Sequence, residues 1–289
     1  MHIFKTIAEL QPFLAECRQA GKSIGFAPTM GALHTGHLSL IQKAQQDCDV
    51  TICSIFVNPT QFNDPADLTR YPRAVERDTE MLEAANCTAL FLPDVTEIYP
   101  DGVKWHNPYH FGALFEVMEG AHRPGHFDGM VQVVKRLLDI VEPDRIYMGQ
   151  KDYQQQTIIK HLLALMHSKT VLVCCPIKRE RDGLAMSSRN VRLTPDDRSL
   201  APYLFQTLRY AQADTHDGYT PQEVRTRAVA RIAAMPAFSL DYFEVVDGET
   251  LLPLNDWHDT TADAVACVTV RLGGVRLLDN IILRLGGMP

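Results

Sequence analysis

Strand-like and helix-like segments alternate along residues 22–175, and this alternation constrains the fold more than any other feature of the sequence. Short apolar runs typical of strands lie at 23–28, 50–58, 89–93, 145–149 and 170–175, and helical patterns lie between them at 38–46, 74–86, 129–141 and 153–167. The run at 50–58 is apolar enough to be buried on both faces. Strands that alternate with helices form βαβ units, so the sequence predicts a Rossmann-like, doubly wound parallel α/β domain.

A different pattern follows Pro176. Two helix starts carry a threonine N-cap before a proline, at Thr194 and Thr220, and Glu223 completes a capping box with Thr220. A strand is expected at 240–248, and Gly273-Gly274 separates two β runs within 264–280, which predicts a hairpin. We therefore expect two domains, residues 1–176 and residues 177–289, the second a smaller α+β domain.

Composition excludes several classes of protein. The 289 residues carry a formal net charge of −7, which argues against nucleic acid as a partner. No apolar run approaches the roughly 20 residues that span a bilayer, and the first residues have no signal-peptide pattern, so no membrane partner is expected. Cysteines at 53, 174 and 175 lie in strand-like runs, where a buried thiol acts as a small hydrophobe, and a reducing cytoplasm is expected.

The stretch FAPTMGALHTGHLSL, residues 26–40, places His34, Gly36 and His37 where a predicted strand becomes a helix. Backbone N–H groups at a helix N-terminus are unpaired and suit a phosphate, and imidazoles in the same turn can donate to phosphate oxygens. In a parallel sheet such a turn lies at the edge where ligands bind. The alternative is a surface turn whose histidines are only solvated caps.

Two distant segments have the same character. Lys151 and Asp152 follow the strand at 145–149, and Ser187, Ser188 and Arg189 form a short polar loop near the domain boundary. Lysine offers a point charge to phosphate and arginine a bidentate one. Each segment alone is more simply read as a solvated Lys-Asp pair or a capping loop. Three such loops in the expected places favour a triphosphate site.

Other polar residues have two interpretations each. The pairs His106/His110 and His122/His126 have the spacing of a zinc-binding helix, but each encloses a proline, so we expect no protein-bound metal. Arg123 either reaches a carboxylate or phosphate of a ligand or supports a turn. Asp78 either helps to hold magnesium or is an exposed carboxylate on a helix.

The segments PTMGALHTGH, FVNPTQF, RPGHFDG, GQKDYQQ and DGLAMSSRN, in this order, resemble the pantothenate synthetase (pantoate–β-alanine ligase) family. The likeness extends to VRLLDN near the C-terminus, which is similar to the family's closing strand. The wider group is that of the HIGH-motif nucleotidyltransferases. Two departures are visible: Gln150 stands where the family commonly has Glu, and residues 101–120 are unusually aromatic and His-rich.

The resemblance implies an ATP-dependent ligation of (R)-pantoate with β-alanine through pantoyl adenylate, with Mg²⁺ arriving bound to ATP. Residues 1–176 would bind nucleotide and pantoate, residues 177–289 would act as a lid, and a homodimer is implied. His37 would be the proton donor, assisted by His34, Lys151, Ser187, Ser188 and Arg189, and Gln61, Gln155 and Arg123 would bind the substrates. The residues expected to contact ATP are Met30, Gly31, Ala32, Leu33, His34, Thr35, Gly36, His37, Gly149, Gln150, Lys151, Asp152, Lys178, Met186, Ser187, Ser188 and Arg189.

Two other functions compete with the ligase. A cytidylyl- or adenylyltransferase would keep the nucleotide on its product and release only pyrophosphate. A non-catalytic nucleotide sensor is the third possibility, but such a protein would be expected to lack some of His34, His37, Lys151 and the Ser-Ser-Arg loop.

Overall fold

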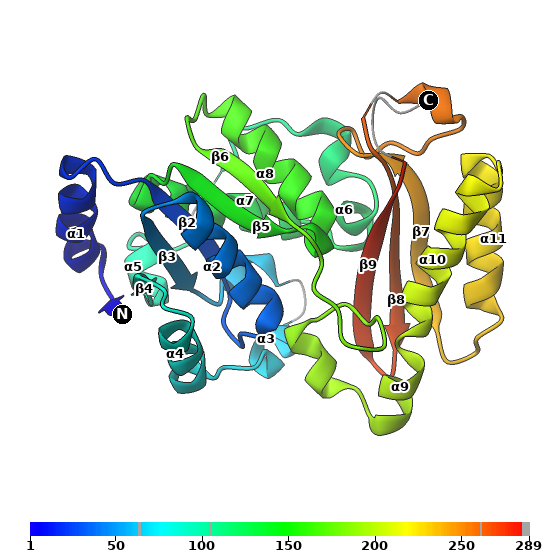
Figure 1. Ribbon diagram of the computed structural model, residues 1–289, viewed down its shortest axis with the longest axis horizontal. Coiled ribbons are helices and arrows are strands. Elements are labelled where there is room, and N and C mark those ends of the chain that lie inside the picture. The colour runs from blue at the N-terminus through cyan, green and yellow to red at the C-terminus, as the bar shows by residue number, and fades with distance from the viewer. Residues whose placement is uncertain (63–64, 104–105, 261, 285–289) are drawn as a thin grey trace. The chain divides into compact units, whose positions relative to one another are not determined.

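A computed structural model (Figure 1) describes residues 1–62, 65–103, 106–260 and 262–284. The chain forms two compact units. The first consists of residues 1–111, 123–149 and 158–176, and the second of residues 112–122, 150–157 and 177–289. From residue 177 onward the chain belongs to the second unit, and the predicted boundary lies at the same place. Residues 112–122 and 150–157 also belong to the second unit, which the sequence did not predict. That residues 1–176 and 177–289 act as separate domains stays a prediction.

The first unit contains a six-stranded sheet in the order β1-β4-β3-β2-β5-β6, in which every neighbouring pair is parallel. Its strands are β1 (His2–Phe4), β2 (Ile24–Thr29), β3 (Val50–Ile55), β4 (Ala89–Phe91), β5 (Arg145–Gly149) and β6 (Val171–Cys175). The strand order reverses between β2 and β5, which lie side by side. This is the switch point at whose carboxyl edge α/β proteins bind ligands.

Helices cover both faces of this sheet (Figure 1), α2 on one face and α1 and α7 on the other. The helices with residues in this unit are α1 (Ile7–Gln19), α2 (Thr35–Asp47), α3 (Pro65–Arg70), α4 (Val75–Ala84), α5 (Val95–Ile98), α7 (His126–Val141) and the greater part of α8 (Tyr153–Leu165). The predicted doubly wound α/β fold is confirmed. The sequence did not predict β1, because three residues are too few to show an alternating pattern.

The second unit has an antiparallel sheet in the order β7-β8-β9, formed by β7 (Ser239–Asp247), β8 (Ala264–Leu272) and β9 (Val275–Arg284). Its helices include α6 (Glu119–His122), α9 (Pro195–Leu200), α10 (Tyr203–His216) and α11 (Pro221–Ala233). Thr194 and Thr220 cap α9 and α11 as predicted, with the Glu223 capping box present. The hairpin at Gly273-Gly274 is also confirmed, and both glycines have a positive φ, as a two-residue turn requires.

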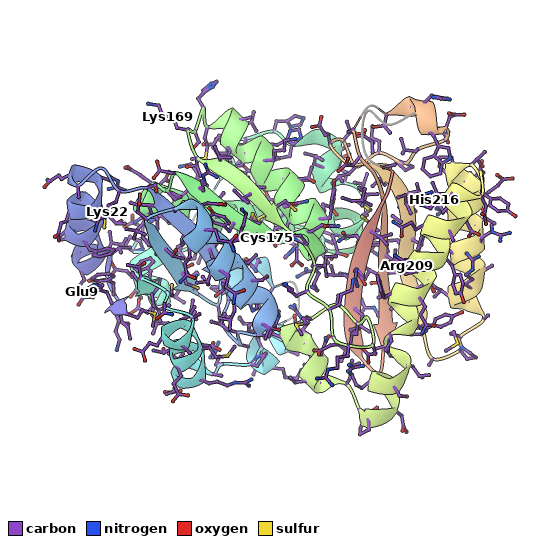
Figure 2. All side chains as sticks on the ribbon, viewed as in Figure 1. Glu9, Lys22, Lys169, Cys175, Arg209 and His216 are labelled. Atoms are coloured by element: carbon purple, nitrogen blue, oxygen red, sulfur yellow. The ribbon has the colours of Figure 1, made fainter. Side chains whose placement is uncertain are left out.

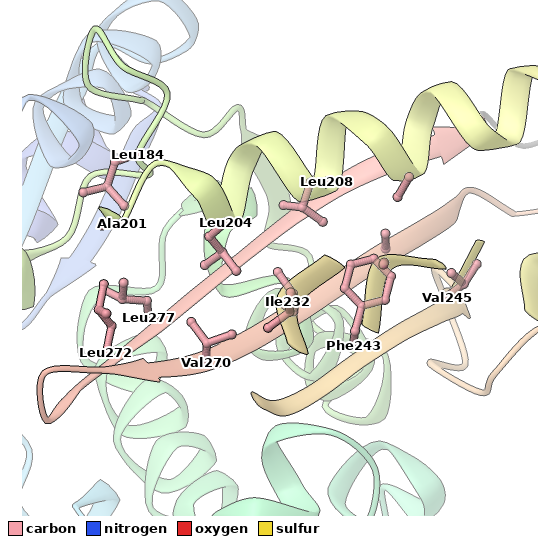
Figure 3. Close-up of a cluster of buried hydrophobic side chains, with 14 of the residues drawn as sticks. Leu184, Ala201, Leu204, Leu208, Ile232, Phe243, Val245, Val270, Leu272 and Leu277 are labelled. Carbon is pink, nitrogen blue, oxygen red and sulfur yellow. The ribbon is translucent and has the colours of Figure 1, made fainter. Parts of the chain in front are cut away.

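A large apolar cluster packs the helices of this unit against its sheet. Figure 3 shows Leu204 and Leu208 of α10 directed toward Val270 and Leu277 of the sheet, and all four are at most 4% exposed. Burying a leucine contributes about 1.5–3 kcal/mol, so α10 fixes β9 firmly. Asp279 and Asn280 lie on β9, so this packing also positions these two buried polar side chains.

The cysteine prediction is correct for two residues and wrong for the third. Cys53 and Cys175 are buried, and burial raises the pKa of the Cys175 thiol to about 11. Cys174 is exposed, because β6 is an edge strand whose side chains alternate between the core and the surface. In Figure 2, Lys22, Lys169 and Arg209 mark the charged surface, and Cys175 lies at the end of β6. None of the helices in the described ranges has the length and apolar character needed to cross a membrane.

Candidate active site

The turn between β2 and α2 is tight and bears both histidines of the predicted site. Gly31 and Ala32 have φ of 79° and 48°, so the chain turns back on itself before α2 begins. His34 is the N-cap of α2, and its Nδ1 accepts a hydrogen bond from the Gly36 N–H at 3.1 Å. The Nδ1 of His37 accepts in the same way from the His34 N–H at 3.3 Å.

These two hydrogen bonds fix the chemistry of both imidazoles. A ring nitrogen that accepts a hydrogen bond carries no proton, so the neutral form of each ring has its proton on Nε2. The rings of His34 and His37 lie with their centroids 4.0 Å apart. In the neutral form the two adjacent rings therefore carry their N–H groups on Nε2, at the start of α2.

Asp78 of α4 holds this turn from behind. Its carboxylate accepts hydrogen bonds from the N–H of Ala32 and of Leu33, each at 2.7 Å, and the residue is only 1% exposed. The interpretation of Asp78 as an exposed helical carboxylate is wrong. An acidic residue in the first turn of a helix gave no indication of which face it occupies.

Gln61 is held in place at the end of a short 3-10 helix, Pro59–Gln61. Its side-chain Oε1 accepts from Asn58 Nδ2 at 3.2 Å, and its Nε2 lies 2.8 Å from the sulfur of Met30. Helix α7 passes so close that a Cβ on Gly129 would be 2.3 Å from the carbonyl oxygen of Thr60. Burial raises the pKa of the Tyr99 phenol to about 12, and its OH donates to Asn58 Oδ1 at 2.9 Å.

Arg123 and His126 support Gln61 through its backbone. His126 Nδ1 donates to the Gln61 carbonyl at 2.7 Å, and Arg123 Nη2 donates to the same oxygen at 3.3 Å. Arg123 Nη1 also donates to His126 Nε2 at 3.0 Å, which this tautomer allows. These bonds engage both ring nitrogens of His126 and favour the interpretation of Arg123 as a support for a turn.

The second unit brings Lys151, Ser187 and Arg189 together around a hollow of about 20 Å³, also lined by Asp279. Lys151 lies in a short 3-10 helix, Gln150–Asp152, with its ammonium 3.6 Å from Asp152. Ser187 Oγ accepts from the Arg189 N–H at 3.3 Å and so begins the 3-10 helix Ser188–Arg192. A hydroxyl, an ammonium and a guanidinium on one hollow suit phosphate oxygens.

The remaining predicted residues take these places. The Lys178 carbonyl accepts from the Met186 N–H at 3.0 Å, and Gln155 is half-buried on α8. Residues 30–37, Gln61, Arg123 and Gly149 belong to the first unit, and Gln150–Asp152, Gln155, Lys178 and Met186–Arg189 to the second. Of the His-rich segment 101–120, residues 104 and 105 lie outside the described residues. The described ranges contain no group of three or more His, Cys, Asp or Glu side chains placed to hold a metal.

A doubly wound parallel sheet with an imidazole-bearing turn at its switch point defines a nucleotide-binding α/β protein. The family model for pantoate-beta-alanine ligase matches residues 2–282. The pantothenate synthetase of Porphyromonas gingivalis W83 is 47% identical over 281 residues, which cover 97% of this chain and 99% of the relative. That of Bacteroides fragilis NCTC 9343 is 45% identical over 283 residues, or 97% and 98% of the two chains.

Solved structures give the same result. The pantothenate synthetase of Thermus thermophilus superposes with a TM-score of 0.92 at 40% identity, covering 98% of this chain and 100% of that one. The pantoate-beta-alanine ligase of Francisella tularensis, complexed with beta-gamma ATP and beta-alanine, has a TM-score of 0.78 at 34% identity and 98% coverage of both. The chain belongs to the pantoate-beta-alanine ligase family.

Proposed function

We propose that this protein condenses (R)-pantoate with β-alanine to form pantothenate, at the expense of ATP and through a pantoyl-adenylate intermediate. The observation that carries the proposal is the match to the ligase family over almost the whole chain. The Nε2–H donors of His34 and His37 at the start of α2 are the chemical feature that fits it.

In the first step a pantoate carboxylate oxygen attacks the α-phosphorus of ATP, and the bond from that phosphorus to the bridging oxygen breaks, releasing pyrophosphate. Negative charge grows on the phosphate oxygens as the leaving group departs. Donors that are already in position stabilise this charge without reorganising. His34 and His37 supply such donors in the first unit, and Lys151, Ser187, Ser188 and Arg189 supply them in the second.

In the second step the amine of β-alanine attacks the acyl carbon of the adenylate, a carbon–nitrogen bond forms, and AMP leaves. Gln61 is proposed to bind both pantoate and β-alanine, and Gln155 to bind pantoate. Neutral amides pair with the hydroxyls and carboxylate of a small acid without adding charge. Arg123 serves this site by holding the backbone of Gln61.

Mg²⁺ is proposed to arrive with ATP, held by phosphates and water, as Mg²⁺ usually is in such sites. The residues around the Lys151 hollow suit this, because ammonium, guanidinium and hydroxyl groups bind phosphate oxygens. The metal would then be bound by phosphate oxygens and water. A homodimer, which the family resemblance supports, and a cytoplasmic location, which the composition supports, complete the proposal.

The test is to incubate the protein with Mg-ATP, pantoate and β-alanine and to measure AMP and pyrophosphate separately. We expect equal amounts of both products, with AMP release dependent on the amine. A transferase would release pyrophosphate without AMP whether or not β-alanine was present, and a sensor would release neither product. Either result would overturn the proposal.

A further inference from the structure

Strand β9 carries two adjacent buried polar residues, Asp279 at 3% and Asn280 at 1% exposure. Asn280 Nδ2 donates to the carbonyl oxygens of Gln150 at 2.9 Å and of Lys151 at 2.8 Å. Gln150 Nε2 donates in return to Asn280 Oδ1 at 3.1 Å. The Asn280 side chain thus makes three hydrogen bonds, all to the turn that bears Lys151.

Asp279 binds the other phosphate-suited segment. Its carboxylate pairs with Arg179 through two bonds, Nη1 to Oδ2 at 2.5 Å and Nη2 to Oδ1 at 2.9 Å. Arg179 also donates to the Gly183 carbonyl at 3.1 Å, and its guanidinium lies 3.8 Å from the centre of the Phe205 ring. Burial raises the pKa of the Asp279 carboxyl, and the Arg179 guanidinium opposes this.

Arg179 stands at the base of the loop that carries residues 186–189. It is bridged to Ala185 in antiparallel fashion, and the Met186 N–H donates to the Lys178 carbonyl. The Arg179 guanidinium, held by Asp279 and Phe205, closes the hairpin from Arg179 to Ala185 and so fixes the segment from which residues 186–189 start. Gly183, in the turn of this hairpin, has a φ of 95°, and a Cβ there would lie 2.4 Å from Phe205.

Burying Asp279 and Asn280 in β9 costs free energy that the strand itself does not require. A buried carboxylate and a buried amide are costly unless each is fully hydrogen-bonded, and an apolar pair would stabilise a hairpin strand at lower cost. The partners of Asp279 and Asn280 on β8 are Val268 and Cys267, so the sheet itself does not need the polar groups. Their side-chain bonds go to the Lys151 turn and the 178–189 loop, apart from one from the Asn280 N–H to Asp279.

We propose that Asp279 and Asn280 are positioning residues for ATP use: Asn280 holds the Lys151 turn, Asp279 holds the Ser187–Arg189 loop through Arg179, and β9 ties the two together. This inference rests on the proposed function, because Lys151 and the loop are taken to contact the triphosphate. It assigns a role to the VRLLDN segment, which the ligation chemistry leaves without one.

The experiment compares two site variants and one control in the 289-residue protein, with a fourth variant held in reserve. Asn280→Asp keeps the shape but removes both donations to backbone carbonyls, and Asn280→Ala is the second variant should the first not fold. Arg179→Lys keeps the charge but loses the two-pronged pairing with Asp279. Gln212→Ala is the matched control, because Gln212 Nε2 donates to the Ile282 carbonyl of the same strand and touches neither segment.

Hydrogen exchange without ligand is measured first. We expect Asn280→Asp to speed exchange at residues 150–152 and Arg179→Lys to speed it at residues 183–189, with Gln212→Ala changing neither. Kinetics follow: in both site variants KM for ATP should rise, or the adenylation rate fall, by about 10- to 100-fold, the size of effect for groups misplaced by about 1 Å. KM for pantoate should stay within about twofold of the parent in both variants, since neither segment is assigned to it.

Unchanged exchange in both variants would overturn the inference. So would faster exchange with normal ATP kinetics, or an equal effect of Gln212→Ala, which would indicate general loosening. Failure of the proposed function would look different, because the parent protein itself would then release no AMP. In that case the exchange measurements alone would still confirm or refute the attachment of the two segments to β9.

Discussion

Asp78 and Leu33 are 45 residues apart in the chain, yet the Asp78 carboxylate accepts a hydrogen bond of 2.7 Å from the Leu33 N–H. The other carboxylate oxygen binds the N–H of Ala32, which has a positive φ. An L-residue in that region of conformational space is strained, and the bond to a buried carboxylate offsets the strain. The turn that bears His34 and His37 is therefore held by a helix outside the sequence motif.

Substituting Asp78→Asn should disturb this turn. An amide can accept with only one of its two terminal atoms, so its NH₂ would face a backbone N–H. We expect a loss of about 1–3 kcal/mol in the free energy of unfolding and a raised KM for ATP. The matched control is Glu76→Gln, an exposed carboxylate on the same helix turn. Normal stability and normal ATP kinetics for Asp78→Asn would show that the hydrogen bonds from Ala32 and Leu33 to Asp78 are not needed.

His37→Ala should slow the first half-reaction. Losing one preorganised donor costs about 2–4 kcal/mol in the barrier, so pyrophosphate release should fall by roughly 30- to 900-fold. KM for pantoate should change far less. His161→Ala, an exposed histidine on α8, is the control. Pyrophosphate release at the parent rate would mean that His37 is not the donor.

The architecture could be predicted because continuous apolar runs, separated by helical patterns, indicate buried strands. The run at 50–58 is an example, because it contains β3, whose six residues are all buried. The residues that hold the site in place could not be predicted. Asp78, Asn58 and Asn280 act on residues that lie 3 to 130 positions away in the chain. No periodicity encodes such pairs. The exposure of Cys174 was missed because a strand-like run does not reveal whether its strand lies at the edge of a sheet.

Substitutions of Gln61 and Gln155 should affect the binding of pantoate and β-alanine differently. Gln61→Ala should raise KM for both pantoate and β-alanine, whereas Gln155→Ala should raise mainly that for pantoate. Gln61 is buried against Asn58 and Met30, and Gln155 is half-buried on α8. Steady-state kinetics with each substrate varied in turn make the measurement, and Gln46→Ala on the exposed side of α2 is the control. Identical profiles for the two variants would refute this division.

Stability at low pH should depend on Asp214. Burial alone would raise the pKa of its carboxyl, but hydrogen bonds from Arg231 and Arg227 outweigh burial and hold the pKa below its usual value. A carboxylate with a lowered folded-state pKa stabilises the protein above its unfolded pKa of about 3.9, and this contribution is lost as pH falls through the folded pKa. Asp214→Asn should therefore cost about 1–3 kcal/mol at pH 7, and less at progressively lower pH below about 4. Asp217→Asn, an exposed neighbour, should cost almost nothing. A cost that is independent of pH would contradict the assignment to charge.

Arg189 should decide how the loop at residues 182–190 meets ATP. The loop is tied at its base by Arg179, while Arg189 and Ser187 line the hollow beside Lys151. We expect Mg-ATP to slow hydrogen exchange over residues 182–190, because triphosphate oxygens engage Arg189 and the loop then excludes water from the adenylate. Arg189→Ala should abolish this protection and leave the thermal unfolding midpoint unchanged, whereas Arg181→Ala, an exposed arginine beside the loop, should keep it. The rate defect of Arg189→Ala belongs in pyrophosphate release, since the triphosphate has left before the amine attacks. A variant that formed adenylate at the parent rate and failed only with β-alanine would place the loop in the second step instead.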